Sequence, residues 1–287
     1  MKALRLLDRH SPGASSPAGP AARRESRVAG PLVIGVLVIS GFFPPSRGVA
    51  QEAEVSPIPS QSGQLIVVVS SSFEANTGIL QRFERAAGDP DWLPVGEPTG
   101  ITLGRNGLGL GVGLHRIERA DMPIKREGDG KSPAGVFRLS SAFGYAPADR
   151  IGDLSIPYTR VTDRLECVDD VNSAWYNRIV DRDEADPVDW QSSEQMLMDG
   201  IWYETGIVVD HNADPVRPGA GSCIFLHNWT GPADTTAGCT AMAPEVLTRM
   251  VRWIDVSREP VLVQLTESMY AEHAAGWGLP AIRGVND

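Results

Sequence analysis

Short apolar runs separated by turn signals dominate the chain from residue 64 onward. Residues 64–70 read QLIVVVS, residues 206–210 GIVVD, residues 222–227 SCIFLH and residues 260–265 PVLVQL. Runs of this length, rich in Val and Ile and bounded by Gly, Pro, Asn or Ser, are typical of β-strands. The one strong helical pattern begins at Pro244, after which apolar residues recur four positions apart. Many short strands and a single helix predict a mainly β domain.

Two segments between these strands have unusual composition. Residues 100–113 (GITLGRNGLGLGVG) are rich in glycine but contain no GxGxxG arrangement that opens a helix. This pattern argues against a dinucleotide site and favours close approach of neighbouring backbones. Residues 149–199 are irregular, acidic and aromatic. A segment of this length is too long for a plain connection and suggests a functional insertion or a lid.

The N-terminal fifty residues have the order of an export signal. Residues 1–29 are basic, residues 30–43 (GPLVIGVLVISGFF) are apolar, and small residues precede Gln51. An apolar stretch of this length suits a signal peptide and is short for a membrane span. We expect export to the periplasm or cell envelope, without stable membrane insertion after cleavage. The expected organisation is a signal peptide over 1–50, a linker over 51–63, a folded domain over 64–267 and a tail over 268–287.

The charge of the chain argues against two classes of partner. The formal net charge is −10, and residues 1–50 hold seven Lys and Arg against two Asp and Glu, so the remaining residues carry −15. A domain this acidic is a poor ligand for nucleic acid or for an anionic membrane surface. We therefore expect neither as a partner.

Three cysteines, Cys167, Cys223 and Cys239, are an odd number, so an exported protein keeps at least one thiol free or pairs it between chains. His227 ends an apolar run twelve residues before Cys239, and a loop of that length can bring imidazole and thiol together. Cysteine reacts as its thiolate, which a neighbouring base helps to form. Gly238 permits a tight turn that can aim backbone N–H groups at an oxyanion. A buried structural cysteine is the alternative interpretation of Cys239.

The segment around Cys239 resembles the active-site signature of the L,D-transpeptidase catalytic domain (YkuD family). That family places a His at a strand end, then a loop, then Ser/Thr-His-Gly-Cys. His227 matches the first position, and Thr236, Gly238 and Cys239 match the second block. The resemblance extends over residues 64–266 and includes Lys125 and residues 130–137 (GKSPAGVF), similar to the family's Thr-Pro-x-Gly-x-Phe block. It implies a β-sandwich or mixed sheet with a short helix after the nucleophile.

Three positions depart from the family pattern. Ala237 stands where the family has His, Thr240 where it has Arg or Asn, and Asn228 where many members have Gly or Ser. Since the nucleophile and the base are both retained, the resemblance implies an active, divergent subfamily with Thr-Ala-Gly-Cys-Thr in place of Ser-His-Gly-Cys-Arg. We expect Gly238, Thr236, Asn228 and Thr240 to contribute to the oxyanion site or to substrate binding.

Other residues have two interpretations each. His211 follows an apolar run and is a candidate for the pocket wall, or a histidine satisfied by Asp210 or by backbone groups. Tyr203 is a candidate to pack on the substrate, or a core aromatic residue. Cys167 and Cys223 form a disulfide that leaves Cys239 free, or they are two separate small hydrophobic residues. No C-x₂-C or H-x₃-H spacing is present, so we expect no metal.

The resemblance implies acyl transfer on peptidoglycan stem peptides through a Cys239 thioester, with release of D-alanine and no cofactor. The alternatives are an L,D-carboxypeptidase or amide hydrolase that resolves the same thioester with water, and a non-catalytic wall-binding domain. A papain-like protease is disfavoured, because Cys239 follows the histidine and lacks the papain surroundings.

Overall fold

The computed structural model describes residues 55–117 and 119–283. The expected signal peptide, residues 1–50, lies outside the described residues. Within the described residues, no helix has both the length and the apolar character needed to cross a bilayer.

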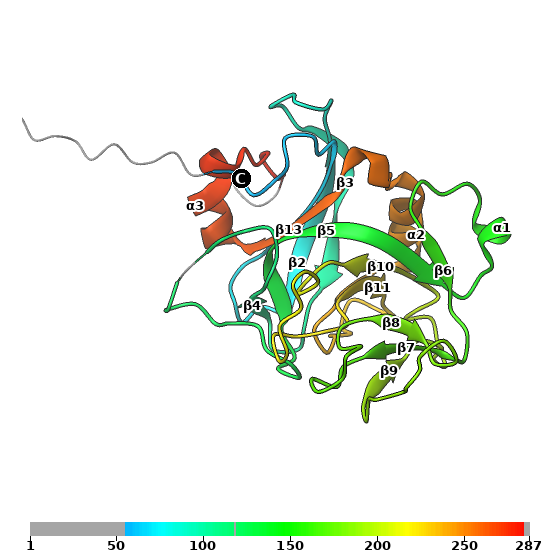
Figure 1. Cartoon of the computed structure of the whole chain (residues 1–287). Coiled ribbons are helices and arrows are strands. Elements are labelled where there is room, and N and C mark those ends of the chain that lie inside the picture. Colours follow the sequence, from blue (N-terminus) through cyan, green and yellow to red (C-terminus); the bar gives the residue numbers. More distant parts are fainter. Residues whose placement is uncertain (1–54, 118, 284–287) are drawn as a thin grey trace, which may run out of the picture. The chain divides into compact units, whose positions relative to one another are not determined.

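A mixed sheet of ten strands forms the body of the domain (Figure 1). Its strands are β1 (Gln64–Ser70), β2 (Thr77–Glu84), β3 (Leu93–Thr102), β4 (Leu108–Leu110), β5 (Ser132–Gly144), β6 (Tyr158–Arg160), β10 (Thr205–Val209), β11 (Phe225–Asn228), β12 (Thr240–Met242) and β13 (Val261–Thr266). The order is β10-β11-β12-β3-β2-β1-β13-β5-β4, and β6 pairs with β5. The mainly β prediction with a mixed sheet is confirmed.

The long strand β5 closes this sheet on itself. Residues Gly135 to Arg138 pair with β13, and the stretch from Leu139 to Gly144 pairs with β10 at the far end of the strand order. The pairs β1–β13 and β11–β12 are parallel, whereas β10–β11 is antiparallel. The closed sheet places β10, β11 and β12 next to one another, and these are the strands around Cys239.

Strand β1 lies between β2 and β13 and is buried on both faces. Leu65, Val67 and Val69 belong to one core, while Ile66 and Val68 belong to the other. Alternate residues of a strand point to opposite faces. A strand covered on both sides therefore reads as a continuous apolar run, which explains the sequence QLIVVVS.

Each of the two cores contains one helix. Helix α2 (Pro244–Trp253) starts at its proline, as predicted, and buries Leu247, Met250 and Val251 in the core that contains Ile66. Pro at the first helical position fits because its missing N–H would have no helical acceptor there.

Helix α3 (Glu267–Trp277) was not expected from the sequence. The Thr266 hydroxyl accepts a hydrogen bond from the Met269 N–H, which caps the helix. Tyr270, Trp277 and the following Ile282 are buried in the core that contains Leu65. The expected domain boundary at 267 thus falls on the first residue of a helix that completes this core. At the other end, Ile58, in the expected linker, is buried in the same core.

The acidic and aromatic segment of residues 149–199 contains a second, three-stranded sheet. In Figure 1 it lies below β5. Its order is β8-β7-β9, with β7 (Leu165–Val168), β8 (Ile179–Asp181) and β9 (Ser193–Gln195), and the short helix α1 (Ala148–Ile151) precedes it. The Glu166 carboxylate organises this sheet by accepting hydrogen bonds from Arg182 at 2.9 Å, Trp190 at 2.8 Å and Ser193 at 2.6 Å.

Candidate functional site

The loop that carries Cys239 is held by the hydroxyl group of Thr236. The Thr236 hydroxyl donates to the Cys239 carbonyl at 2.7 Å and accepts from the Gly238 N–H at 3.1 Å. Gly238 has φ of 156°, and a Cβ there would lie 3.1 Å from the Lys131 carbonyl oxygen. Glycine suits this position because it adopts such a conformation without steric cost. The loop therefore holds the Cys239 backbone in one place.

Parallel pairing of β11 and β12 brings His227 to Cys239. His227 pairs with Ala241, two residues after Cys239. Side chains two residues apart share a face of an extended chain. Both side chains contribute to one cavity of about 490 Å³. Its other walls include Lys125, Glu127, Asp169, Glu194, Met198, Trp202, Tyr203, Ser222, Cys223, Ile224, Thr236, Ala237 and Gly238.

The Cys239 thiol is buried, with 7% of the residue exposed. Its sulfur accepts a hydrogen bond from the Phe225 N–H at 3.3 Å and donates to the Cys223 carbonyl at 3.4 Å. Burial, reinforced by the negative charge of Glu194, raises the pKa of this thiol to about 12. The thiol is therefore neutral near pH 7, and a reaction through its sulfur would need a base to take the proton.

His227 has the tautomer that such a base needs. Its Nδ1–H donates to the Asn228 carbonyl at 2.7 Å, which leaves Nε2 as the proton acceptor. Burial lowers the pKa of this imidazole, so the ring is neutral. The Tyr203 ring meets it edge to face, with 5.5 Å between ring centroids.

Tyr203 and Glu194 join the cavity to the three-stranded sheet. The Tyr203 hydroxyl donates to the Glu194 carboxylate on β9. Burial raises the pKa of Glu194, and the nearby charge of Asp169 adds to this effect. Tyr203, a sequence candidate, is thus a cavity residue and packs on the histidine. Glu194 was not singled out by sequence reasoning, although the segment that carries it was expected to be functional.

Three expected substrate-binding residues do not line the cavity. Thr240 is buried and donates to the Gln264 side chain at 2.8 Å. The Asn228 amide donates to the Ile201 carbonyl at 2.9 Å, so its side chain braces the turn before Tyr203. His211 accepts from the Val112 N–H at 3.2 Å and contacts the Ala220 carbonyl at 3.0 Å. His211 is therefore the histidine satisfied by backbone groups, and burial lowers its pKa to about 4.

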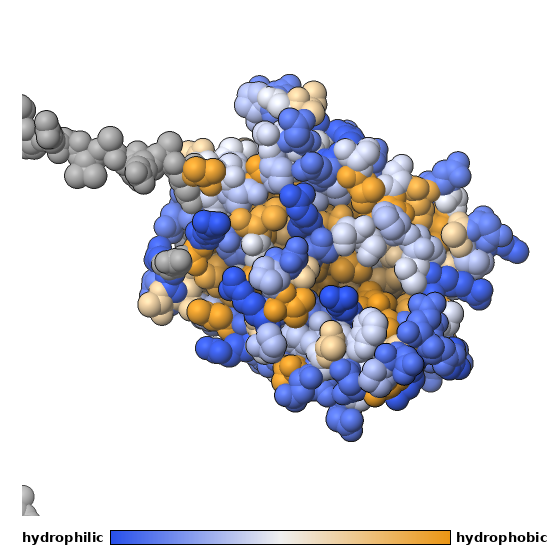
Figure 2. Space-filling model, viewed as in Figure 1, coloured by the Kyte–Doolittle hydropathy of each residue, from blue (hydrophilic) through white to orange (hydrophobic). Residues whose placement is uncertain are grey.

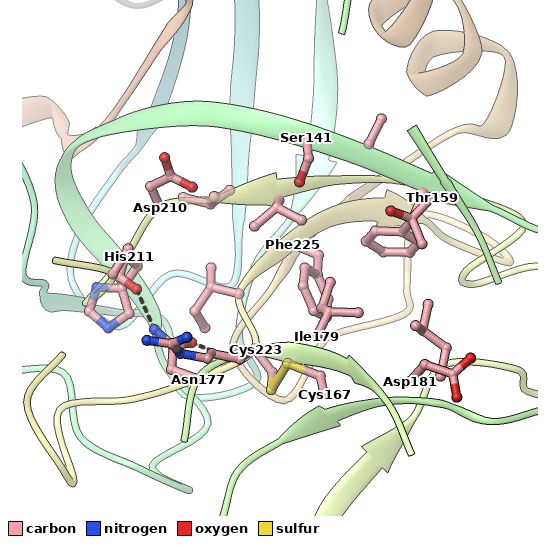
Figure 3. Close-up of a pocket in the computed structure, with 18 of the residues that line it drawn as sticks. Ser141, Thr159, Cys167, Asn177, Ile179, Asp181, Asp210, His211, Cys223 and Phe225 are labelled. Atoms are coloured by element: carbon pink, nitrogen blue, oxygen red, sulfur yellow. Dashed lines mark hydrogen bonds between the residues drawn. A yellow bond between two sulfur atoms is a disulfide. The ribbon is translucent and has the colours of Figure 1, made fainter. Parts of the chain in front are cut away.

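A larger cavity of about 670 Å³ lies on the other side of Cys223 (Figure 3). It opens between β5, β10 and the three-stranded sheet, and Phe225 and Ile179 line it. Figure 2 shows a hollow with exposed apolar residues on this face, surrounded by hydrophilic ones. His211 belongs to this cavity, whereas Cys239 and His227 do not.

The disulfide between Cys167 and Cys223 contributes to the wall of this larger cavity. It joins β7 of the three-stranded sheet to the segment ahead of β11 and leaves Cys239 as the free thiol among the described residues. Of the two interpretations of these cysteines, the structure contains the disulfide. In the part of the chain that the structure describes, no group of three His, Cys, Asp or Glu side chains is placed to hold a metal ion.

Comparison with known proteins agrees with this geometry. The chain matches the family model of the YkuD L,D-transpeptidase catalytic domain over residues 92–263. No match was found among curated proteins or among solved structures. The matched region contains β3 to β12, the helix α2, the three-stranded sheet and the whole cavity around Cys239. The chain therefore belongs to the YkuD family of L,D-transpeptidase catalytic domains.

Proposed function

We propose that the protein is a cysteine acyltransferase that cross-links peptidoglycan stem peptides by L,D-transpeptidation. The observation that carries the proposal is the pairing of a single free thiol with a histidine whose Nδ1 is bound to a backbone carbonyl. Both lie in one cavity large enough for a peptide end. We further propose that the protein is exported, as the basic and apolar order of residues 1–43 suggests.

The first half-reaction forms a thioester. His227 Nε2 takes the proton of Cys239 as the sulfur adds to the carbonyl that joins an L-centre to the terminal D-alanine of a tetrapeptide stem. The tetrahedral intermediate then collapses, the C–N bond breaks, and the imidazolium gives its proton to the leaving amine of D-alanine. In the second half-reaction an amine of another stem attacks the thioester, the C–S bond breaks, and the sulfur regains a proton through His227.

The Gly238 N–H donates to the Thr236 hydroxyl, and that hydroxyl donates to the Cys239 carbonyl. Both donors are therefore already used within the loop. We therefore assign the oxyanion contact to the backbone N–H of Cys239. Backbone donors held in a rigid loop stabilise an oxyanion without reorganising during the reaction.

The test is a muropeptide assay with the purified protein. A tetrapeptide donor should release D-alanine and add the acyl mass to Cys239, and an acceptor stem should then yield the cross-linked product. Cys239→Ala should abolish release, and His227→Ala should lose most of it, with partial recovery at higher pH. Because the two residues act as a unit, the double variant should be scarcely worse than Cys239→Ala.

The other outcomes separate the alternatives. Release of D-alanine without cross-linking in the presence of acceptor would indicate a carboxypeptidase. Substantial turnover by Cys239→Ala would rule out the nucleophile. Binding of stem peptides with no acylation of Cys239 would indicate a non-catalytic wall-binding domain.

A further inference from the structure

Lys125 is a buried lysine in the wall of the Cys239 cavity. Its side chain is 3% exposed. The Lys125 backbone N–H donates to the Leu110 carbonyl at 2.9 Å, which fixes the residue beside β4. Its aliphatic stem passes Gly221, where a Cβ would lie 3.0 Å from Lys125 Cε. A lysine is rarely buried unless its charge is paired or used.

The ammonium group of Lys125 reaches the loop that carries the nucleophile. It donates to Asp129 Oδ1 and to the Arg126 carbonyl, each at 2.7 Å. An ammonium has three N–H donors, so one remains. Nζ lies 3.7 Å from the position that a Cβ on Gly238 would occupy, and Gly238 precedes Cys239. Glycine at 238 thus leaves the space between this charge and the nucleophile free of a side chain.

Apart from Lys125, the charged side chains that line the cavity are carboxylates, which disfavour a negative charge on the Cys239 sulfur. Three carboxylates line it, those of Glu127, Asp169 and Glu194. Among the described residues that line this cavity, Lys125 alone is a Lys or Arg. The other titratable groups that face the sulfur add no cation, since His227 is kept neutral by burial and the Tyr203 hydroxyl is bound to Glu194.

Position 237 offers no substitute for this charge, because the side chain of Ala237 cannot carry one. The Glu194 charge raises the pKa of Cys239, whereas the Lys125 charge lowers it. The Lys125 ammonium therefore offsets the effect that the carboxylates of the cavity wall have on the Cys239 thiol.

We propose that Lys125 is an electrostatic partner of Cys239, whose ammonium stabilises the negative charge that forms on Sγ and then on the substrate carbonyl oxygen. An opposite charge in a water-excluded cavity favours the ionised form of its neighbour. The part concerning the carbonyl oxygen rests on the proposed acyl transfer. The part concerning the sulfur does not depend on the substrate, so it can be tested without a wall peptide.

The experiment measures the rate of Cys239 alkylation by iodoacetamide from pH 6 to pH 11, followed by intact-protein mass spectrometry. Lys125→Met should lower the alkylation rate about tenfold or more throughout this pH range, because the thiolate fraction falls tenfold for each unit by which the thiol pKa rises. Lys125→Arg should recover much of the loss, because the charge is kept. The matched control is Arg105→Met, which removes one positive charge from an exposed position on a loop bound to Thr236.

Asp129→Asn separates an electrostatic role from a structural one. Asp129 also accepts from the Arg126 and Lys131 N–H groups, so both Lys125→Met and Asp129→Asn disturb the same turn. A structural role would slow alkylation in both variants. An electrostatic role predicts opposite changes in the alkylation rate, because removing the Asp129 charge leaves the ammonium less neutralised and should speed the alkylation of Cys239.

Two results would overturn the proposal: a folded Lys125→Met whose alkylation profile matches the parent protein, or shifts in the same direction for Lys125→Met and Asp129→Asn. Failure of acyl transfer with all muropeptides, together with the expected alkylation shifts, would refute the proposed function and leave the role of Lys125 standing.

Discussion

The Ser132 hydroxyl, at the start of β5, donates a 2.7 Å hydrogen bond to the backbone carbonyl of Cys239, although 107 residues separate them. The same hydroxyl accepts from the Gly104 N–H at 2.8 Å. Ser132 is fully buried, and a Cβ at Gly104 would lie 2.8 Å from its backbone nitrogen. One side chain therefore ties the nucleophile loop to β5 and to the glycine-rich segment.

Ser132→Ala should destabilise the domain and slow the reaction of Cys239. It leaves the Gly104 N–H buried without its acceptor, which costs about 1–3 kcal/mol. Urea unfolding would measure the stability, and alkylation of Cys239 would measure reactivity. The exposed Ser60→Ala is the control, expected to change the free energy of unfolding by less than about 0.5 kcal/mol. Equal stabilities for the two variants would contradict an anchoring role for Ser132.

Loss of the Cys167–Cys223 disulfide should lower the free energy of unfolding more than substitution of the free Cys239 does. The bridge spans 56 residues and holds the three-stranded sheet against the segment ahead of β11. The Cys167→Ser, Cys223→Ser double variant should lose about 2–4 kcal/mol of unfolding free energy. Cys239→Ser is the control, and its stability should still depend on reductant as that of the parent does. A parent protein whose unfolding is insensitive to dithiothreitol would disprove this prediction.

Because of Glu166, the free energy of unfolding should fall as the pH is lowered. Burial would raise its pKa, but hydrogen bonds from Ser193, Arg182 and Trp190 outweigh this and lower the pKa from 4.5 to about 2. A depressed folded-state pKa contributes stability that is complete above the unfolded value and is lost as the pH falls through the folded one. Between pH 4.5 and about 2 the parent should lose stability that Glu166→Gln has already lost at pH 7. The measurement is the free energy of unfolding as a function of pH, and parallel curves for the parent and Glu166→Gln over this range would contradict the prediction. The control is Glu74→Gln, at an exposed position, whose curve should follow that of the parent.

Helix α3 should be required for the fold. Trp277 is 4% exposed and belongs to the core that contains Leu65. Trp277→Ala should cost about 3–5 kcal/mol, the usual cost of emptying a large aromatic site in a core. Leu93→Ala removes a side chain from a residue that is 67% exposed and should be nearly neutral. Thermal unfolding followed by circular dichroism compares the two, and similar midpoints would show that α3 is dispensable.

The sequence predicted the elements whose signals are local. The strand at residues 64–70 and the start of α2 at Pro244 both follow from short-range patterns. The buried residues of α3 share one face, but that face includes the polar His273, and the residues outside it include several alanines, so the sequence shows little contrast between the two faces. The closure of the sheet through β5 and β10 joins segments far apart in sequence, and no local pattern records it.

In the candidate site too, the residues with local sequence signals were predicted and those brought in by long-range contacts were not. His227 is on β11, Cys239 immediately precedes the neighbouring strand β12, and both line one cavity, as their spacing suggested. Thr240 points away, and the alternation of side chains along β12 could have shown this, since a residue next to the nucleophile faces the opposite side. Lys125 and Glu194 come from segments distant in sequence, so only the fold reveals that they surround the sulfur.

The pairing of β1 with β13 also sets when this chain can fold during its synthesis. β1 is an inner strand, and one of its two neighbours, β13, is made of residues 261–266, which follow β1 far later in the sequence. Pairings of such long sequence separation form late, because a large loop must close before they stabilise anything. A ribosome-bound chain that lacks β13 has an open edge on β1 and on β5. The sheet of this domain therefore cannot be completed until residues 261–266 have left the ribosome.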